Sequence, residues 1–305
     1  MANTRSIRPA GARELVQTVG RLPALPGVVS QLVEISSDQN ATAAQLSQVV
    51  SLDPGLLTSI LKLANSAYYG CSRTVSDLEA AIMLLGFDQV RDLALSLNVI
   101  AAIEPPGVSA FSTREYWKHA FMAGSLARGF CRPLWRVYPG EHYVAGFLHD
   151  IGRLVLYLAD PSAMREVVAG VNAGRDALAE ERRVYGCDHA EVGGLACRHW
   201  RLPDRITAAV GAHHGAGLAQ EPSLAEQELV QMVHVADLLA NRAGLGFTAR
   251  RPRHRLAPAI RLALARRGVW LRRSRLAPLV ARTAAEVEAT AQILAVGQPA
   301  ASEGG

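Results

Sequence analysis

The chain has 305 residues, half of them apolar, and a formal net charge of +5. This length can bury one large core or two modest ones. No run reaches about 18 consecutive apolar residues, which argues against a membrane span, and the N-terminus lacks the basic and apolar regions of a secretory signal. The four cysteines are scattered without a CxxC pair, so we expect free thiols and a cytoplasmic protein.

Positive charge is concentrated near the C-terminus. Residues 250–282 hold eleven Arg and no acidic side chain, whereas the rest of the chain holds 21 basic and 27 acidic side chains, or −6. Lys62 and Lys118 are the only lysines, so genome composition and a functional basic surface explain the arginine excess equally well. The segment has no aromatic interleaving beyond Trp270, which makes nucleic-acid binding the weaker interpretation.

Composition, capping residues and prolines predict a chain that is mostly helical. Pro23 and Pro26 exclude a helix where they stand and predict an extended link. Thr42, Asp53 and Asp77 are suited to cap helices, and a proline follows Asp53 at the first helical position. In this first part of the chain we expect helices over 14–19, 28–35, 42–51, 54–63, 77–85 and 87–103.

A break at 104–107, Glu-Pro-Pro-Gly, separates a second helical part. There we expect Thr113 to cap a helix that runs to Phe130, and Asp188 to precede a helix with His189 in its first turn. Another helix begins at Pro139 and carries His149 and Asp150. The other predicted helices are 161–171, 176–185, 203–214, 227–240, 257–267 and 275–294, and residues 297–305 are predicted to be disordered.

An adjacent imidazole and carboxylate, His149-Asp150, stand inside an apolar run. A charged carboxylate there is costly to bury unless something pairs with it. Side chains adjacent on a helix point about 100° apart, so both could reach one ion only if other ligands closed around it. Further His and Asp residues lie at the apolar edges of helical segments, and the full candidate set is His119, His149, Asp150, His189, His213, His214 and Asp237. Nitrogen and oxygen ligands without thiolate suit Fe, Mn, Zn or Mg.

Three phrases in the first part, LPALPGVV, SLDPGLLTSILKLANSAYYG and LEAAIMLLGFDQVRDLAL, resemble the HDOD domain, a bacterial output module related to the HD metal-dependent phosphohydrolases. With the His-Asp half, the resemblance covers roughly residues 15–240. It implies that His119, His149, Asp150 and Asp237 hold a metal. The extra histidines, His189, His213 and His214, match relatives with two or more metals.

The resemblance leaves several neighbouring residues without a ligand role. Glu115 shares a face with His119 and is either a solvated carboxylate near a helix N-terminus or an extra ligand. Arg153 stands where active relatives often carry Lys; it could face an anion, although such an arginine is more often on the surface. His142, His199 and His234 have no counterpart in the motif, and we interpret His142 and His199 as structural.

The resemblance implies a signal-transduction output or regulatory module that acts by binding a protein or ligand, with one or two divalent ions retained. The alternative is a metal-dependent phosphodiesterase or nucleotidase. Gly215-Ala216-Gly217-Leu218 replaces the Gly-Tyr-Pro extension of cyclic-di-GMP hydrolases, which weakens that alternative. No catalytic residue is assigned. A signalling protein is the expected partner, a nucleotide a possible ligand, and the sequence gives no oligomeric state.

The predicted fold is all-α. An N-terminal helical half, residues 12–104, packs on an HD-like helical half, residues 108–245, and together they form one HDOD domain over 12–245. An Arg-rich helical extension and tail, residues 246–305, follow.

Overall fold

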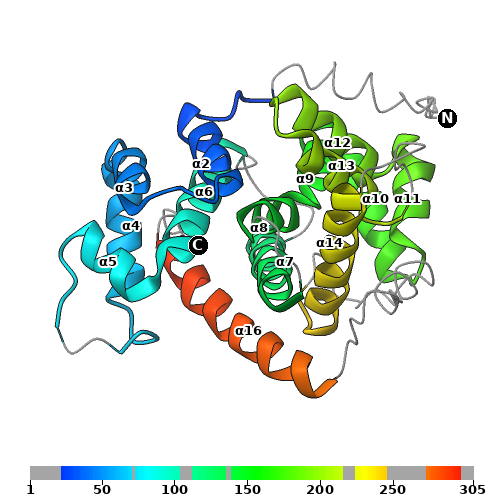
Figure 1. Ribbon diagram of the computed structural model, residues 1–305. Coiled ribbons are helices and arrows are strands. Elements are labelled where there is room, and N and C mark those ends of the chain that lie inside the picture. The colour runs from blue at the N-terminus through cyan, green and yellow to red at the C-terminus, as the bar shows by residue number, and fades with distance from the viewer. Residues whose placement is uncertain are drawn as a thin grey trace, which may run out of the picture.

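The computed structural model describes residues 22–70, 73–103, 112–134, 139–215, 224–245 and 273–296. Within these ranges every regular element is a helix, which confirms the all-α prediction (Figure 1). The first part contains α2 (Gly27–Ser37), α3 (Ala43–Ser51), α4 (Pro54–Ala64), α5 (Leu78–Leu85) and α6 (Phe87–Ile103). The second contains α7 (Thr113–Leu134), α8 (Pro139–Leu148), α9 (Ile151–Ala159), α10 (Pro161–Asn172), α11 (Ala177–Tyr185), α12 (His189–His199), α13 (Asp204–Ala212) and α14 (Leu224–Arg242), and α16 (Arg273–Val296) comes last.

Several helices begin where short polar side chains satisfy the free backbone N–H groups. Thr42 and Gln45 form a capping box at α3, and Asp53 accepts from the N–H groups of Gly55 and Leu56 at α4. The prediction that Thr113 caps α7 is wrong. The helix already includes Thr113, and the Ser112 hydroxyl accepts from the backbone N–H of residue 115 at 3.2 Å.

The N-terminal half is built around α6, which buries side chains along most of its length. Asn65 ends α4 and holds the following loop: its side chain exchanges two hydrogen bonds of 2.8 Å with the backbone of Val75. The link before α2 reaches the other half, where the Trp200 indole donates to the carbonyl of Pro23 at 3.2 Å. The two halves are thus joined through this link as well as through the packing of α2 on α8.

In the HD-like half, glycines allow the helices that carry the His and Asp residues to approach closely. A Cβ placed on Gly146 in α8 would lie 2.8 Å from the carbonyl oxygen of Ala123 in α7. One on Gly152 in α9 would lie 1.9 Å from the carbonyl oxygen of His189 in α12. These two crossings set the distances between the histidines of different helices.

The C-terminal helix α16 packs on α7 of the HD-like half and on α4 of the N-terminal half, and it runs across the lower side of the molecule (Figure 1). Glu286 of α16 accepts from Gln89 at 3.1 Å and lies 3.7 Å from Arg128, which also pairs with the buried Asp92. A cavity of about 20 Å³ lies at this junction. Polar contacts therefore connect both halves with α16.

A few predictions concern residues outside the described ranges: the helices over 14–19 and 257–267 and the disorder of 297–305. The predicted helix over 275–294 lies within α16. Among the residues that the structure describes, no helix combines the length and the apolar character that crossing a membrane requires.

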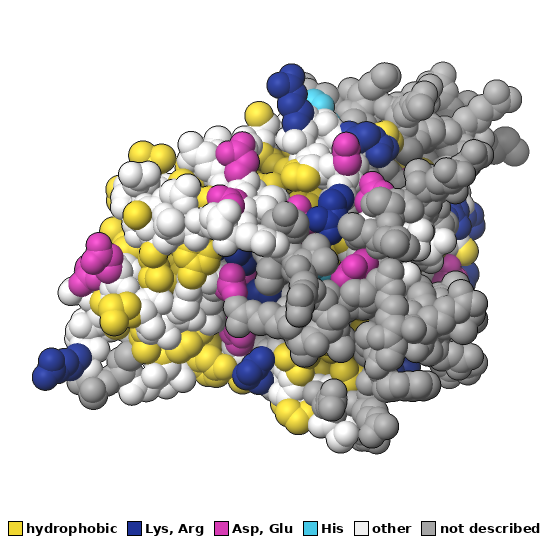
Figure 2. Space-filling model, viewed as in Figure 1, with side chains coloured by type: hydrophobic (Ala, Val, Ile, Leu, Met, Phe, Trp, Pro, Cys, Tyr) yellow, Lys and Arg dark blue, Asp and Glu magenta, His cyan; other side chains and the backbone are white. Residues whose placement is uncertain are grey.

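Among the described residues, the exposed large apolar side chains lie in the N-terminal half. Leu52, Tyr68, Met83 and Leu84 are exposed, Met83 to 89%. Figure 2 shows hydrophobic side chains gathered on the left of the molecule, where Figure 1 places α3, α4 and α5.

Candidate metal centre

The seven residues singled out in the sequence come together in two adjoining groups. One consists of His119, His149 and Asp237, and the other of Asp150, His189, His213 and His214. Within each group, one potential ligand atom per residue lies within 4.8 Å of all the others. Six of the seven side chains are buried and His214 is partly buried.

We predicted that one continuous helix carries His149 and Asp150, and this prediction is wrong. Helix α8 ends at Leu148, α9 begins at Ile151, and the pair forms the turn between them. Asp150 is at the N-cap position of α9, but its side chain accepts no capping hydrogen bond. Its carboxylate is therefore directed at other side chains, and the break lets both residues of the pair face the same centre.

Backbone carbonyls fix the orientation of three imidazoles. Nδ1 of His119 lies 3.0 Å from the carbonyl oxygen of Leu245, and Nδ1 of His149 lies 2.7 Å from that of Gly146. Nδ1 of His213 lies 2.8 Å from the carbonyl oxygen of Val210. Since a carbonyl only accepts, each Nδ1 carries the proton. A ring in this tautomer, when neutral, presents the lone pair of Nε2, which is the form that binds a metal.

The Nε2 atoms converge, which is unfavourable unless a proton or a metal ion lies among them. In the first group, the Nε2 atoms of His119 and His149 are 3.2 Å apart. The Asp237 Oδ1 atom lies 3.2 Å from the first and 3.6 Å from the second. Two ligands each about 2.1 Å from one ion lie about 3.0–3.4 Å apart in octahedral or tetrahedral geometry. These separations suit a single ion.

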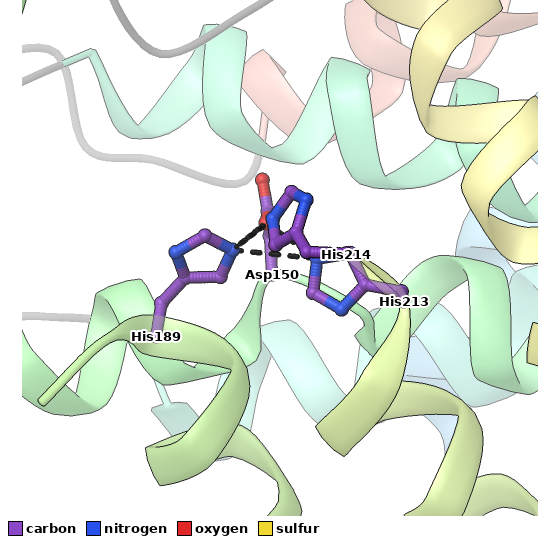
Figure 3. Close-up of side chains that lie close together, drawn as sticks. All are labelled: Asp150, His189, His213 and His214. Atoms are coloured by element: carbon purple, nitrogen blue, oxygen red, sulfur yellow. Dashed lines mark hydrogen bonds and ion pairs between the residues drawn. The ribbon is translucent and has the colours of Figure 1, made fainter. Parts of the chain in front are cut away.

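The second group has comparable spacings (Figure 3). His189 Nε2 lies 3.0 Å from Asp150 Oδ1, 3.3 Å from His213 Nε2 and 3.0 Å from His214 Nε2. In Figure 3 the three imidazoles, from α12 and from the turn after α13, gather around the Asp150 carboxylate. This group also has the donors and the spacing for a divalent ion.

Asp150 lies between the two groups. Its Oδ1 faces His189, whereas its Oδ2 lies 3.6 Å from His119 Nε2 and 3.5 Å from His149 Nε2. Each carboxylate oxygen thus faces a different set of nitrogens. Asp150 has the placement of a carboxylate shared by two ions.

The electrostatics keep the carboxylates ionised. Burial raises the pKa of Asp150, but Arg153 and His149 outweigh it and hold that pKa well below its usual range. Burial also raises the pKa of Asp237, and hydrogen bonds with His119 and His149 lower it further than burial raises it. Both side chains are therefore anionic at neutral pH and could serve as metal ligands.

The histidines divide into two kinds when no metal is bound. Burial, followed by the nearby histidines, lowers the pKa of His213 and of His214 well below the usual value, so both are neutral. Burial and Arg153 lower the pKa of His189, but Glu181 and Asp150 raise it to about 9. The pKa of His149 is also raised, because Asp150 and Asp237 outweigh its burial. His189 therefore holds a proton that a metal must displace.

Arg153 is buried. We noted from the sequence that such an arginine is more often on the surface, and that does not hold here. Its Nη1 donates to Asp150 Oδ2, and its Nε donates to Glu181 Oε1 at 3.3 Å. With neutral histidines, the carboxylates of Asp150, Asp237 and Glu181 against one guanidinium leave a net charge of −2. One divalent cation balances this charge, and a second calls for an anion as well.

Glu181 is the member of this environment that sequence reasoning missed. It lies in α11 between the buried Ala177 and Tyr185, four residues from each, so its carboxylate is at the centre of an apolar helix face. Its spacing from Ala177 and Tyr185 could have revealed that Glu181 is buried. The run of charged residues EERR instead suggested a solvent-exposed stretch.

The other polar residues discussed in the sequence lie apart from the two groups. Glu115 is partly exposed and lies 3.5 Å from Lys118, in agreement with the solvated interpretation. His234 Nδ1 donates to the backbone oxygen of His213 at 2.8 Å and so supports a ligand without joining the set. His142 is buried and His199 is exposed, and neither belongs to a metal-competent group among the described residues.

The helical fold and the buried His and Asp groups define the class: an HD-type helical protein with side chains that could hold a metal. The family model of the HDOD domain matches residues 22–216, and the chain belongs to this family. A signalling or HD-related role follows from this membership.

Relatives and solved structures agree with the assignment. An uncharacterized protein of Treponema pallidum is 26% identical over 208 residues, which are 66% of this chain but 40% of that protein. An HDOD domain protein with unknown function from Geobacter sulfurreducens has a TM-score of 0.74 at 24% identity, covering 92% of this chain and 95% of its own. A candidate signal transduction protein from Marinobacter aquaeolei has a TM-score of 0.74 at 22% identity, covering 93% and 66% respectively. At these identities the structures show a shared fold.

Proposed function

We propose that this HDOD protein is a bacterial signal-transduction output module of the cytoplasm that binds a divalent metal and acts by binding a protein or ligand. The seven residues His119, His149, Asp150, His189, His213, His214 and Asp237 would hold one or two ions of Fe, Mn, Zn or Mg. The family assignment and the convergence of their nitrogen and oxygen atoms support this proposal.

The burial of the ligand set is the observation that favours a binding role over hydrolysis. A catalytic metal needs an open coordination position for water and substrate, whereas a structural metal is enclosed. His149, His189 and His213 have no exposed surface, and Asp150 and Asp237 are 1% and 5% exposed. A centre enclosed in this way holds α7, α9, α12, α13 and α14 in fixed positions.

The burial of the Arg153 guanidinium also supports a binding role over hydrolysis. Arginine binds phosphate through a free face of its guanidinium group. Here that group is buried against Asp150 and Glu181. It is used to balance the carboxylates rather than held ready for an anion.

A surface for a protein partner is available on the N-terminal half. The exposed Leu52, Tyr68, Met83 and Leu84 lie on or beside α3, α4 and α5. Apolar side chains gathered on one face often mark a protein interaction site. The Marinobacter aquaeolei relative, described as a candidate signal transduction protein, agrees with such a role.

The alternative is a metal-dependent phosphohydrolase. The complete donor set favours it, because divalent ions lower the pKa of bound water and polarise phosphoryl oxygen. A structure from Shewanella amazonensis described as a candidate phosphohydrolase has a TM-score of 0.68 at 24% identity, covering 92% of this chain and 97% of its own.

A turnover assay distinguishes the two functions. Wild-type protein reconstituted with Mn²⁺ or Fe²⁺ is incubated with nucleotides and cyclic dinucleotides, with Asp237→Ala as the metal-site control. We expect the same background release of phosphate or nucleotide from both proteins. Turnover in the wild type that Asp237→Ala abolishes would contradict the binding role and establish the hydrolase.

A further inference from the structure

We propose that Glu181, which is outside the ligand set, positions His189 and Asp150 and so controls the second group, Asp150, His189, His213 and His214, selectively. The first group, His119, His149 and Asp237, would depend on it only through the shared carboxylate of Asp150. This inference rests on the proposed metal site and adds a residue that sets the affinity of one half of that site.

Glu181 contacts His189 in two ways. Its Oε2 accepts from His189 Nδ1 at 2.6 Å and from the His189 backbone N–H at 2.9 Å. Both groups are fully buried. The carboxylate therefore fixes the ring orientation, places the proton on Nδ1 and directs Nε2 at Asp150 and the other histidines.

Glu181 also reaches the second ligand through Arg153. Its Oε1 accepts from Arg153 Nε at 3.3 Å, and Arg153 Nη1 donates to Asp150 Oδ2. His189 Nε2 lies 3.0 Å from Asp150 Oδ1 and closes the ring of four side chains. Two members of this ring are ligands and two are not, so Glu181 and Arg153 together fix the separation of the ligands.

The selectivity follows from what holds the other imidazoles. His119, His149 and His213 donate Nδ1–H to backbone carbonyls, which no side-chain substitution removes. Of these four rings, His189 alone relies on a carboxylate. A carboxylate partner also makes the opposite nitrogen a stronger donor than a carbonyl does. Loss of Glu181 should therefore weaken the second group and leave His119, His149 and Asp237 in place.

The test measures metal affinity by competition with a chromogenic chelator, using Co²⁺ and Mn²⁺, with the Co²⁺ absorption spectrum as a second readout. The variants are Glu181→Ala, Glu181→Gln and the matched control Glu180→Ala. Glu180 is the adjacent glutamate of α11 and pairs with Arg175 and Arg183, away from the site. Asp237→Ala identifies the ion of the first group, and circular dichroism checks that each variant is folded.

We expect Glu181→Ala to weaken the binding of one ion by about 10- to 100-fold, which is the usual effect of removing a carboxylate that is hydrogen-bonded to a ligating histidine. Glu181→Gln keeps the size and one acceptor oxygen, so its loss should be smaller. Glu180→Ala should bind metal as the wild type does. The ion that Glu181→Ala retains should be the one that Asp237→Ala removes, and the Co²⁺ spectrum should keep only that component.

Two results would overturn the inference. If Glu181→Ala and Glu181→Gln bind every ion with wild-type affinity, Glu181 does not position the ligands. If Glu180→Ala weakens binding as strongly as Glu181→Ala, the effect comes from α11 in general. Failure of the proposed function is a different outcome, because the wild type itself would then bind no metal in the same assay.

Discussion

The proton on each imidazole decides what the site can bind. Carbonyl oxygens accept hydrogen bonds from the Nδ1–H groups of His119, His149 and His213, and the carboxylate of Glu181 accepts one from Nδ1–H of His189. The opposite nitrogens then meet at separations of 3.2 and 3.3 Å. Such a meeting is stable only with a proton or a metal ion between the rings.

Arg153→Ala tests the role of the buried guanidinium. The change leaves the carboxylates of Asp150 and Glu181 buried without their cation, so the metal-free protein should lose about 3–5 kcal/mol of unfolding free energy. Urea unfolding measures this loss. Added Mn²⁺ should recover part of it, because the ion supplies the missing positive charge. An equal loss with and without metal would show that Arg153 serves only the packing.

Metal affinity should rise with pH. The pKa of His189 is about 9 in the metal-free protein because Glu181 and Asp150 outweigh burial and Arg153. Below this pH a bound metal must displace the His189 proton, so affinity should increase about tenfold per pH unit between pH 7 and 8 and level off above about 9. Chelator competition at each pH measures the slope. An affinity that does not change between pH 6 and 9 would contradict the assignment of His189 as a ligand.

For single residues, the sequence indicates which side chains could bind a metal but not which groups hold those side chains in place. The seven candidate residues were recognisable from the His and Asp pattern and the family resemblance. Their partners were not, since the acceptors are carbonyls of distant segments, such as Leu245 for His119. Arg153 and Glu181 lie 28 residues apart, and only the packing of α9, α11 and α12 brings them together.

Helix boundaries carry much of the site's geometry. Asp188 caps α12 through a capping box with Glu191, which places His189 at the first helical position. The turn at His149 and Asp150 separates α8 from α9. Capping residues predicted the first of these features from local chemistry. The second was missed because the apolar run from Tyr143 to Leu158 reads as one continuous helix.

Gly152→Ala tests the close crossing of α9 and α12. The added Cβ would meet the His189 carbonyl oxygen at 1.9 Å and the Gly193 backbone nitrogen at 2.8 Å, so the helices must separate. We expect a loss of about 3 kcal/mol of unfolding free energy and weaker metal binding by the second group.

Gly27→Ala is the matched control for that substitution. Gly27 begins α2, and a Cβ there meets nothing within 4 Å. Its effect should be neutral or stabilising by less than about 1 kcal/mol. If urea unfolding gives the same stability for Gly152→Ala and for the wild type, the helices do not cross as closely as described.

Over the whole molecule, α16 connects the two halves. Glu286 lies among Gln89, Arg128 and Asp92 where α6, α7 and α16 meet. Lys118, next to the candidate ligand His119 in α7, pairs with Glu288 of α16 at 2.5 Å. The C-terminal helix α16 is thus in contact with the helix that carries the first candidate metal ligand. The sequence predicted this helix but not its position, because long-range packing leaves no local signal.

Glu286→Ala and Glu288→Ala compare two carboxylates of α16. Removing Glu286 leaves part of the Arg128 and Gln89 hydrogen-bonding capacity unsatisfied in a largely buried site, with an expected loss of about 1–3 kcal/mol. The Glu288 side chain is 52% exposed, so its removal should cost less than about 1 kcal/mol. Chemical denaturation of both variants provides the measurement. Equal losses would mean that the buried junction is no more important than a surface ion pair.

The most direct test of the account is the metal content of protein purified without chelator, for the wild type and for Asp150→Ala. Asp150 faces both groups, with Oδ1 toward His189 and Oδ2 toward His149. We predict about one or two equivalents of Fe, Mn or Zn in the wild type and a loss of that metal in the variant. A wild type that holds no metal, even after reconstitution with each ion, would contradict the account and leave the His and Asp cluster as a polar core.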